Sequence, residues 1–406
     1  MVAILAIGLA YAAVALAGAV QRDSAVDRMR TTSGPLTVSA QSLYRSLFDA
    51  DATAAAAFLS GGTEPKELRD RYDNDIAAAS AALADISGDP TANRSSINTL
   101  TANLPVYAGL VETARADNRA GLPVGAAYLR EASALMHSTL LAAATSVNRA
   151  ESDGMEADRA AGAGFPWLAL PLGVALVVVL LATARLLTRR TNRVFNIGVT
   201  TAVLAVAISM IWMVASWGAA TTHLNKARTD GSAQVKNLVT IRIAVLEARA
   251  DESLTLVARG SDTEFEQDFQ QVLTRILGKT NATGFLTSAQ ADATDPAVRK
   301  LISSVSTDLK GWQAAHKTLR QLDDAGDYPR AVQMATQERT GDTTPYFDRV
   351  DTNLARAIDL TSKHFTAQGA AAASAQGGEA AAVTVLIALA LVAATIGVQR
   401  RIAEYR

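Results

Sequence analysis

Four long apolar runs constrain this chain more than any other feature, because each is about as long as a helix that crosses the hydrocarbon core of a bilayer. They cover residues 1–20, 165–184, 195–220 and 380–398. None of them contains a charged side chain, and a helix that is apolar on every face belongs in a membrane or in the core of a large protein. We therefore predict four transmembrane helices.

The first run has a second interpretation, because a secretory signal peptide also begins with an apolar stretch. Residues 16–19 resemble a cleavage site with small side chains. Against this, the run has no basic flank and is longer than the usual apolar core of a signal peptide. We expect a membrane anchor, and the missing flank is consistent with a natural start upstream of Met1.

Basic residues next to the runs predict the orientation of the chain, because Lys and Arg accumulate on the cytoplasmic side of membrane spans. The turn at residues 185–194 and the tail at residues 399–406 are both short and basic. Their arginines are Arg185, Arg189, Arg190 and Arg193 in the turn, and Arg400, Arg401 and Arg406 in the tail. We predict a multi-pass protein of the plasma membrane with both termini in the cytoplasm and both long segments, 21–164 and 221–379, outside.

Three tryptophans support this orientation, because indoles prefer the membrane interface. Trp167, Trp212 and Trp217 fall at the predicted outer ends of their spans. The arginines are then first an orientation device. Two further roles are open to them. They form either a basic patch that binds anionic membrane lipid or the surface that a cytosolic partner binds, since little else faces the cytosol.

Each long segment has the pattern of packed helices. Leu43, Leu47, Ala50, Ala54 and Ala57 are spaced 4, 3, 4, 3 in the first segment, as on the seam of a bundle helix. Turn residues then separate further helices, one of them bent or interrupted near Pro105. The predicted fold class is an all-α membrane protein with four transmembrane helices and two extracytoplasmic antiparallel four-helix bundles.

The second segment repeats features of the first. Residues 49–53, followed by Gly61, resemble residues 247–253, followed by Gly260, with a slippage of one residue. Tyr107, with Ala120-Gly121 after it, matches Trp312 with Ala325-Gly326 at identical spacing. Several matches in order indicate an internal duplication of the unit span, bundle, span.

Candidate site residues come from this repeat. Asp49 and Asp51 lie on the first bundle helix, where they are either polar contacts for a ligand or partner or ordinary carboxylates at a helix edge. Tyr107 and Trp312 are either bundle core or part of a recognition surface. These four residues are our candidate ligand-binding or partner-binding positions.

Other functional classes find no support in the sequence. There is no cysteine, hence no disulfide and no Cys-based metal or redox site. The four histidines are scattered, and no nucleotide-binding loop, HExxH or GxSxG occurs. The net charge of -1 gives no reason to propose nucleic acid, and the spans lack the ionisable residues of ion-coupled transporters. We expect no enzyme, metal or cofactor.

Residues 43–79, LYRSLFDADATAAAAFLSGGTEPKELRDRYDNDIAAA, resemble the exported helical domain of actinobacterial GlnX-type membrane proteins. The order of spans and segments fits as well. The resemblance implies a role beside a glutamate- or aspartate-sensing lipoprotein, GlnH, and a relay to the cytosolic serine/threonine protein kinase G. It supplies no binding residue that can be carried over.

The leading hypothesis is a non-catalytic transmembrane signal transducer that relays extracytoplasmic glutamate or aspartate availability to a cytosolic kinase. The alternatives are a direct small-molecule sensor and a structural adaptor of an envelope complex.

Overall fold

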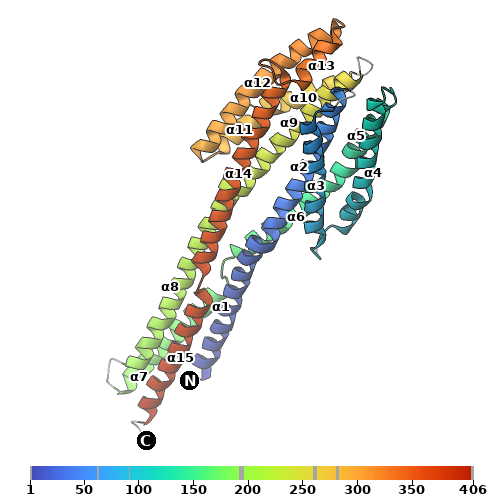
Figure 1. Ribbon diagram of the computed structural model, residues 1–406. Coiled ribbons are helices and arrows are strands. Elements are labelled where there is room, and N and C mark those ends of the chain that lie inside the picture. The colour runs from blue at the N-terminus through green and yellow to red at the C-terminus, as the bar shows by residue number, and fades with distance from the viewer. Residues whose placement is uncertain are drawn as a thin grey trace. The chain divides into compact units, whose positions relative to one another are not determined.

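The computed structural model describes residues 2–61, 64–90, 92–191, 196–258, 263–279 and 283–403, with the backbone alone at residues 190, 191 and 401–403. All regular structure in these ranges is helical (Figure 1), as the sequence predicts. The elements are α1 (Val2–Arg28), η1 (Met29–Ser33), α2 (Gly34–Leu59), α3 (Lys66–Ser87), α4 (Arg94–Arg119), α5 (Gly125–Leu135), η2 (Met136–Leu140), α6 (Leu141–Gly162), α7 (Ala169–Thr191), α8 (Ile197–Lys226), η3 (Ala227–Ser232), α9 (Ala233–Ala258), α10 (Glu264–Leu277), α11 (Phe285–Asp292), α12 (Pro296–Asp324), α13 (Tyr328–Thr336), α14 (Thr343–Gln376) and α15 (Glu379–Ala403).

The chain divides into two compact units. The first, here the span unit, consists of Met1–Thr32, Met155–Ala227 and Thr366–Arg406. The second, here the large unit, consists of Ser33–Gly154 and Arg228–Phe365. The chain passes from one unit to the other four times, each time inside a helical segment: in η1, in α6, at η3 and in α14. Two of these segments, η1 and η3, are π-helical turns.

The span unit contains the four apolar runs. Four helices among the described residues are long and apolar enough to cross a membrane, which confirms the predicted number. The helices extend beyond the runs themselves, since α1 continues to Arg28 and α8 to Lys226. Small residues let α8 and α15 approach closely, because a Cβ at Gly198 would lie 2.5 Å from the carbonyl oxygen of Ala393.

The described parts of both basic segments lie at one end of the span unit. The Asn196 side chain donates a hydrogen bond of 2.9 Å to the carbonyl oxygen of Gly397, so the start of α8 lies beside the last turns of α15. Arg185, Arg189 and Arg400 are therefore gathered at this end. Arg193 and Arg406 lie outside the described residues, and the side chains of Arg190 and Arg401 are not described.

Aromatic and charged side chains mark the other end of the span unit. Phe165 makes edge-to-face contacts with Trp167 and with Trp217. At this end Glu379, in the first turn of α15, accepts a hydrogen bond from Ser216 beside Trp217 and pairs with Arg22 of α1, and both charged side chains are buried. This ion pair lies just beyond the apolar runs at residues 1–20 and 380–398, and its two partners are distant in the chain.

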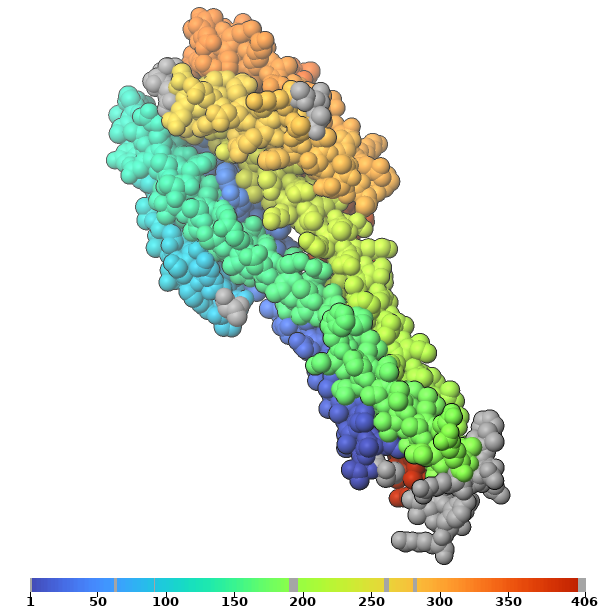
Figure 2. All heavy atoms as spheres, turned by 180° about the vertical axis from the view of Figure 1, so that it is seen from behind, coloured from blue at the N-terminus to red at the C-terminus, as the bar shows by residue number. Residues whose placement is uncertain are grey.

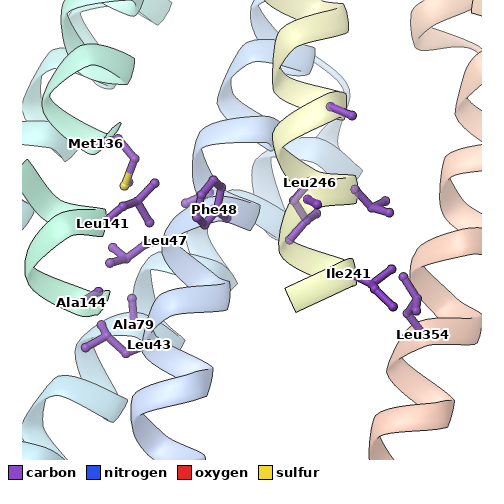
Figure 3. Close-up of a cluster of buried hydrophobic side chains, with 14 of the residues drawn as sticks. Leu43, Leu47, Phe48, Ala79, Met136, Leu141, Ala144, Ile241, Leu246 and Leu354 are labelled. Atoms are coloured by element: carbon purple, nitrogen blue, oxygen red, sulfur yellow. The ribbon is translucent and has the colours of Figure 1, made fainter. Parts of the chain in front are cut away.

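The large unit brings the two long segments together. Both contribute to one hydrophobic core, in place of a separate core for each predicted bundle, and the halves lie side by side (Figure 2). In Figure 3, Leu43, Leu47 and Phe48 of α2 lie between side chains of the first half and Leu246 of α9.

The helices α2 and α9 are the central elements of this unit. Every residue of α2 from Ser46 to Ala57 is buried, including those outside the predicted 4-3 seam. A helix surrounded on all sides is apolar or small on all sides, and the alanines at residues 50–57 meet that requirement. Pro105 is accommodated inside α4, which runs on to Arg119 without the predicted interruption.

Candidate functional site

The two aspartates of α2 enter different polar networks. Asp49 and Asp51 are both 2% exposed, so neither is the carboxylate at a helix edge that we considered. Residues two positions apart in a helix point about 200° apart. The carboxylates of Asp49 and Asp51 therefore lie on nearly opposite sides of α2.

Asp51 accepts three hydrogen bonds from the first half of the large unit. The donors are the Tyr107 hydroxyl of α4 at 3.2 Å, the Ser133 hydroxyl of α5 at 2.9 Å and Nε2 of His137 at 3.2 Å. His137 lies in the π-helical turn η2, a local geometry that is often found at functional sites. We call Asp51, Tyr107, Ser133 and His137 the Asp51 cluster.

A second carboxylate, Asp251 of α9, faces the Asp51 cluster. It is 6% exposed, and its buried Oδ2 has no hydrogen-bond partner among the described residues. Burial raises the pKa of Asp251 to about 8, and the negative charges of Glu247, Asp268 and Asp51 add to the shift against the opposing effect of His137.

The imidazole of His137 is shifted as well. Burial acts to lower the pKa of His137, but the hydrogen bond to Asp51 and the charge of that carboxylate outweigh burial and raise it. The pKa of Asp251 and the pKa of His137 therefore both lie above those of isolated side chains of the same types.

The second half contains a related cluster around Glu252 of α9, which is fully buried. Glu252 accepts hydrogen bonds from the indole nitrogen of Trp312 at 3.0 Å, from Nδ1 of His316 at 2.9 Å and from Arg249 at 2.6 Å. The other ring nitrogen of His316 lies 3.0 Å from Glu266 of α10. We call these residues the Glu252 cluster.

The two clusters have the same arrangement of residue types. Each has a buried carboxylate on a central helix and an aromatic donor on the helix that the repeat makes equivalent, Tyr107 on α4 and Trp312 on α12. The sequence paired these two aromatic residues, and the structure places each beside such a carboxylate.

The clusters differ in charge balance. His316 lies between two carboxylates, and these partners outweigh burial and raise its pKa to about 9. Despite burial, the hydrogen bond from His316 and the charge of Arg249 lower the pKa of Glu252. The Glu252 cluster is therefore a closed ionic network, whereas Asp251 beside the Asp51 cluster has neither a cation of its own nor a donor among the described residues.

Asp49 joins a network that connects the two halves. It accepts a hydrogen bond of 3.2 Å from Arg71 of α3 and lies 4.0 Å from Arg242 of α9. Arg242 in turn binds Asp351 of α14 through two nitrogens, at 2.6 and 2.9 Å. Burial raises the pKa of Asp75 to about 7, and the charge of Asp49 adds to the shift. These charged side chains connect α2 and α3 of the first half with α9 and α14 of the second half.

A cavity lies at the C-terminal ends of the central helices α2 and α9. Its volume is about 840 Å³, within the usual range of small-molecule sites. Residues from the ends of α2 and α9, from the start of α5 and from α13 line it, and most are apolar. Its polar lining includes Asn118, Arg130 and Tyr328. This cavity forms only where the two halves meet, so no local pattern in the sequence indicates it.

Several site residues were missed from the sequence for a common reason. Ser133, His137 and Asp251 carry no motif, and their partners are distant in the chain. The segment at residues 247–253 was matched to residues 49–53 by the repeat, and this was the one signal that pointed to Asp251 and Glu252.

Comparison with known proteins gives one match. Residues 25–160 match the model of a family described as an actinobacterial sensor domain. The matched range contains Asp49 and the whole Asp51 cluster and covers less than half of the chain. No curated protein and no solved structure matches. Together with four helices suited to a membrane, the match supports an actinobacterial sensor protein.

Proposed function

We propose that this chain is a non-catalytic transmembrane signal transducer whose large unit receives an extracytoplasmic signal. One observation carries the proposal: a sensor-domain match at residues 25–160 occurs in a chain with four helices suited to a membrane. The arginine-rich turn and tail gather at one end of the span unit, and the positive-inside rule assigns that end to the cytoplasm.

The signal in this proposal is glutamate or aspartate availability, delivered by a solute-binding lipoprotein of the GlnH type. The output is a cytosolic serine/threonine kinase of the protein kinase G type, acting directly or through an intermediary. The basic turn with Arg185 and Arg189 and the tail with Arg400 are the cytosolic surfaces on which such a partner would act. The GlnX-type resemblance of residues 43–79 motivates these identities.

Helical connections support a mechanical relay. Each of the four passages between the units lies inside a helical segment, and small shifts or rotations of helices are an established means of transmitting a state. The π-helical turns η1 and η3 occupy two of these passages. A π-turn carries one residue more than an α-turn, so its gain or loss changes the angular register of the helix that follows.

Binding of the lipoprotein to the full-length protein in nanodiscs tests the proposal. Leu122 and Val124, which are 50% and 48% exposed, form an apolar surface after α4 and are the residues to change. We expect the lipoprotein to bind in a manner that depends on glutamate or aspartate, and Leu122→Asp with Val124→Asp to weaken binding at least tenfold.

Val106→Asp is the matched control, because Val106 is an apolar residue of similar exposure, 51%, in the middle of α4. It should leave binding unchanged. Binding that does not respond to either amino acid would instead favour the structural adaptor.

The cavity favours direct sensing of a small molecule as the second candidate function. Its volume accommodates a ligand of amino-acid size or larger. In that case glutamate or aspartate would raise the thermal stability of the purified chain without any lipoprotein. Val332→Trp, which places an indole at the cavity wall, would abolish that rise.

A further inference from the structure

We propose that Asp251, at the contact of α2 with α9, is a proton-binding site whose occupancy sets the charge beside the Asp51 cluster. The inference concerns regulation of the large unit and does not depend on the identity of the ligand or partner proposed above. The ligand in this case is the proton itself.

The first argument is the contrast between two neighbouring buried carboxylates. Asp51 receives three hydrogen bonds, from Tyr107, Ser133 and His137. Asp251 is 6% exposed, and its Oδ2 has no donor in the described part of the chain. A buried carboxylate without a donor is costly as an anion, and binding a proton removes the charge.

The second argument is the set of charged groups that face Asp251. Glu247 lies one turn earlier on α9, Asp268 comes from α10, Asp51 comes from α2 and His137 comes from η2. Three of these four groups are acidic, and Glu247 is itself paired with Arg275 at 3.1 Å. The surroundings of Asp251 are therefore negative on balance, which favours its neutral form.

The neighbouring cation does not neutralise Asp251. Arg249 lies two residues earlier on α9, but its guanidinium binds Glu252, Thr344 and the carbonyl oxygen of Ala335. Arg249 is therefore committed to the Glu252 cluster on another face of the helix.

Proton occupancy changes the charge at the contact of α2 with α9. With Asp251 neutral and His137 protonated, the carboxylate of Asp51 and the imidazolium balance. After both groups lose a proton, Asp51 and Asp251 leave two negative charges at this contact. The pKa of about 8 for Asp251 places the loss of its proton at mildly alkaline pH, and the hydrogen bond to Asp51 raises the pKa of His137 above its ordinary value. Alkaline conditions should loosen the contact.

Infrared difference spectroscopy of the full chain in nanodiscs tests the proton site directly, because a protonated carboxyl group has its own C=O stretch. We expect the wild-type protein to lose such a band as the pH rises through about 8. The Asp251→Asn variant, which has nearly the same shape and no titratable group at this position, should lack this change and keep the separate loss of the Asp75 carboxyl band near pH 7. An unchanged pH difference spectrum in Asp251→Asn would overturn the assignment.

A second variant keeps the proposal testable if Asp251→Asn alters the fold. Glu247→Gln removes a negative neighbour without touching Asp251, so the band should disappear at a lower pH than in the wild type. Asp308→Asn, which removes a carboxylate of α12 that is paired with Arg349 of α14, is the control and should leave the titration in place. Equal titrations in Glu247→Gln and the wild type would contradict the proposal.

The same preparation separates a proton from another cation. If Mg²⁺, Ca²⁺ or a small amine at constant pH removed the band in the wild type and caused no change in the spectrum of Asp251→Asn, the site would be a cation site and the proposal would be wrong. Lipoprotein binding plays no part in this measurement, so its failure would leave the proton site intact.

Discussion

At the scale of single residues, carboxylates of the same kind have different chemical states because their neighbours differ. Asp51 has three donors, Asp251 has none among the described residues, and Glu252 is enclosed by Arg249, Trp312 and His316. All three are buried on α2 or α9. The identity of the residue does not determine its role here; the hydrogen-bond donors around it do.

Asp251→Asn should stabilise the folded chain near pH 7. The pKa of Asp251 is about 8 in the fold and 3.8 in its ordinary state, so from about pH 4 to pH 8 the folded chain holds a proton that the unfolded chain has lost. This difference lowers stability as the pH rises through that window. The variant removes it, with a gain on the order of a few kcal/mol near pH 7. Unfolding midpoints at pH 4 and pH 7 measure the gain, which should be small at pH 4.

Glu252→Gln should destabilise the chain by roughly 3–5 kcal/mol, because it leaves the buried charges of Arg249 and His316 without their partner. The pKa of His316, raised to about 9, means that the cluster stabilises the fold fully below pH 6.5 and loses this contribution as the pH rises through 9. The variant should also flatten that loss. Glu67→Gln, at an exposed position of α3, is the control in the same denaturation series and should change little.

At the scale of elements, close approach depends on glycine and alanine where two helices meet. A Cβ at Gly198 would lie 2.6 Å from the Cα of Gly397, and Ala202, Ala390 and Ala394 are buried along the same helices. The central helix α2 uses alanine in the same way in the large unit. Alanine is abundant throughout the chain, so its spacing alone gave little indication of which helices pair.

Gly198→Leu should lower the thermal stability of the full chain, because the new side chain has no space between α8 and α15. Overpacking of this kind costs about 1–3 kcal/mol. Gly218→Leu is the control on the same helix, since a Cβ there meets nothing within 4 Å. Equal melting temperatures for the two variants in detergent would show that the close approach is not required.

At the scale of the whole molecule, the predicted topology leaves most of the chain outside the cell. Because the chain has no cysteine, single cysteines report their location cleanly. Ala84→Cys on α3 and Gln271→Cys on α10 are exposed positions in the two long segments, and Gln399→Cys lies next to the tail arginines. An impermeant maleimide should label the first two in intact cells and Gln399→Cys only after permeabilisation. Labelling of Gln399→Cys in intact cells would reverse the orientation.

At this scale the two long segments form a single large unit. The repeat predicted equivalent halves, and Tyr107 and Trp312 do occupy comparable places beside buried carboxylates. It did not predict that α2 would pack against α9, or that Asp49, Arg242 and Asp351 would connect the halves.

The sequence by itself determined the helical class, the number of candidate spans and the end of the span unit that carries the arginines. These properties depend on local composition: a run of apolar side chains sets the length and the environment of a helix, whatever lies elsewhere in the chain. The tertiary structure alone decided which carboxylates are satisfied, which keep an oxygen without a donor, as Asp75 and Asp251 do among the described residues, and where a cavity forms. Those properties depend on contacts between residues far apart in the chain, such as Asp51 with His137 and Glu252 with His316. No local pattern encodes such contacts, because the energy of a buried charge is set by the groups that the fold brings around it.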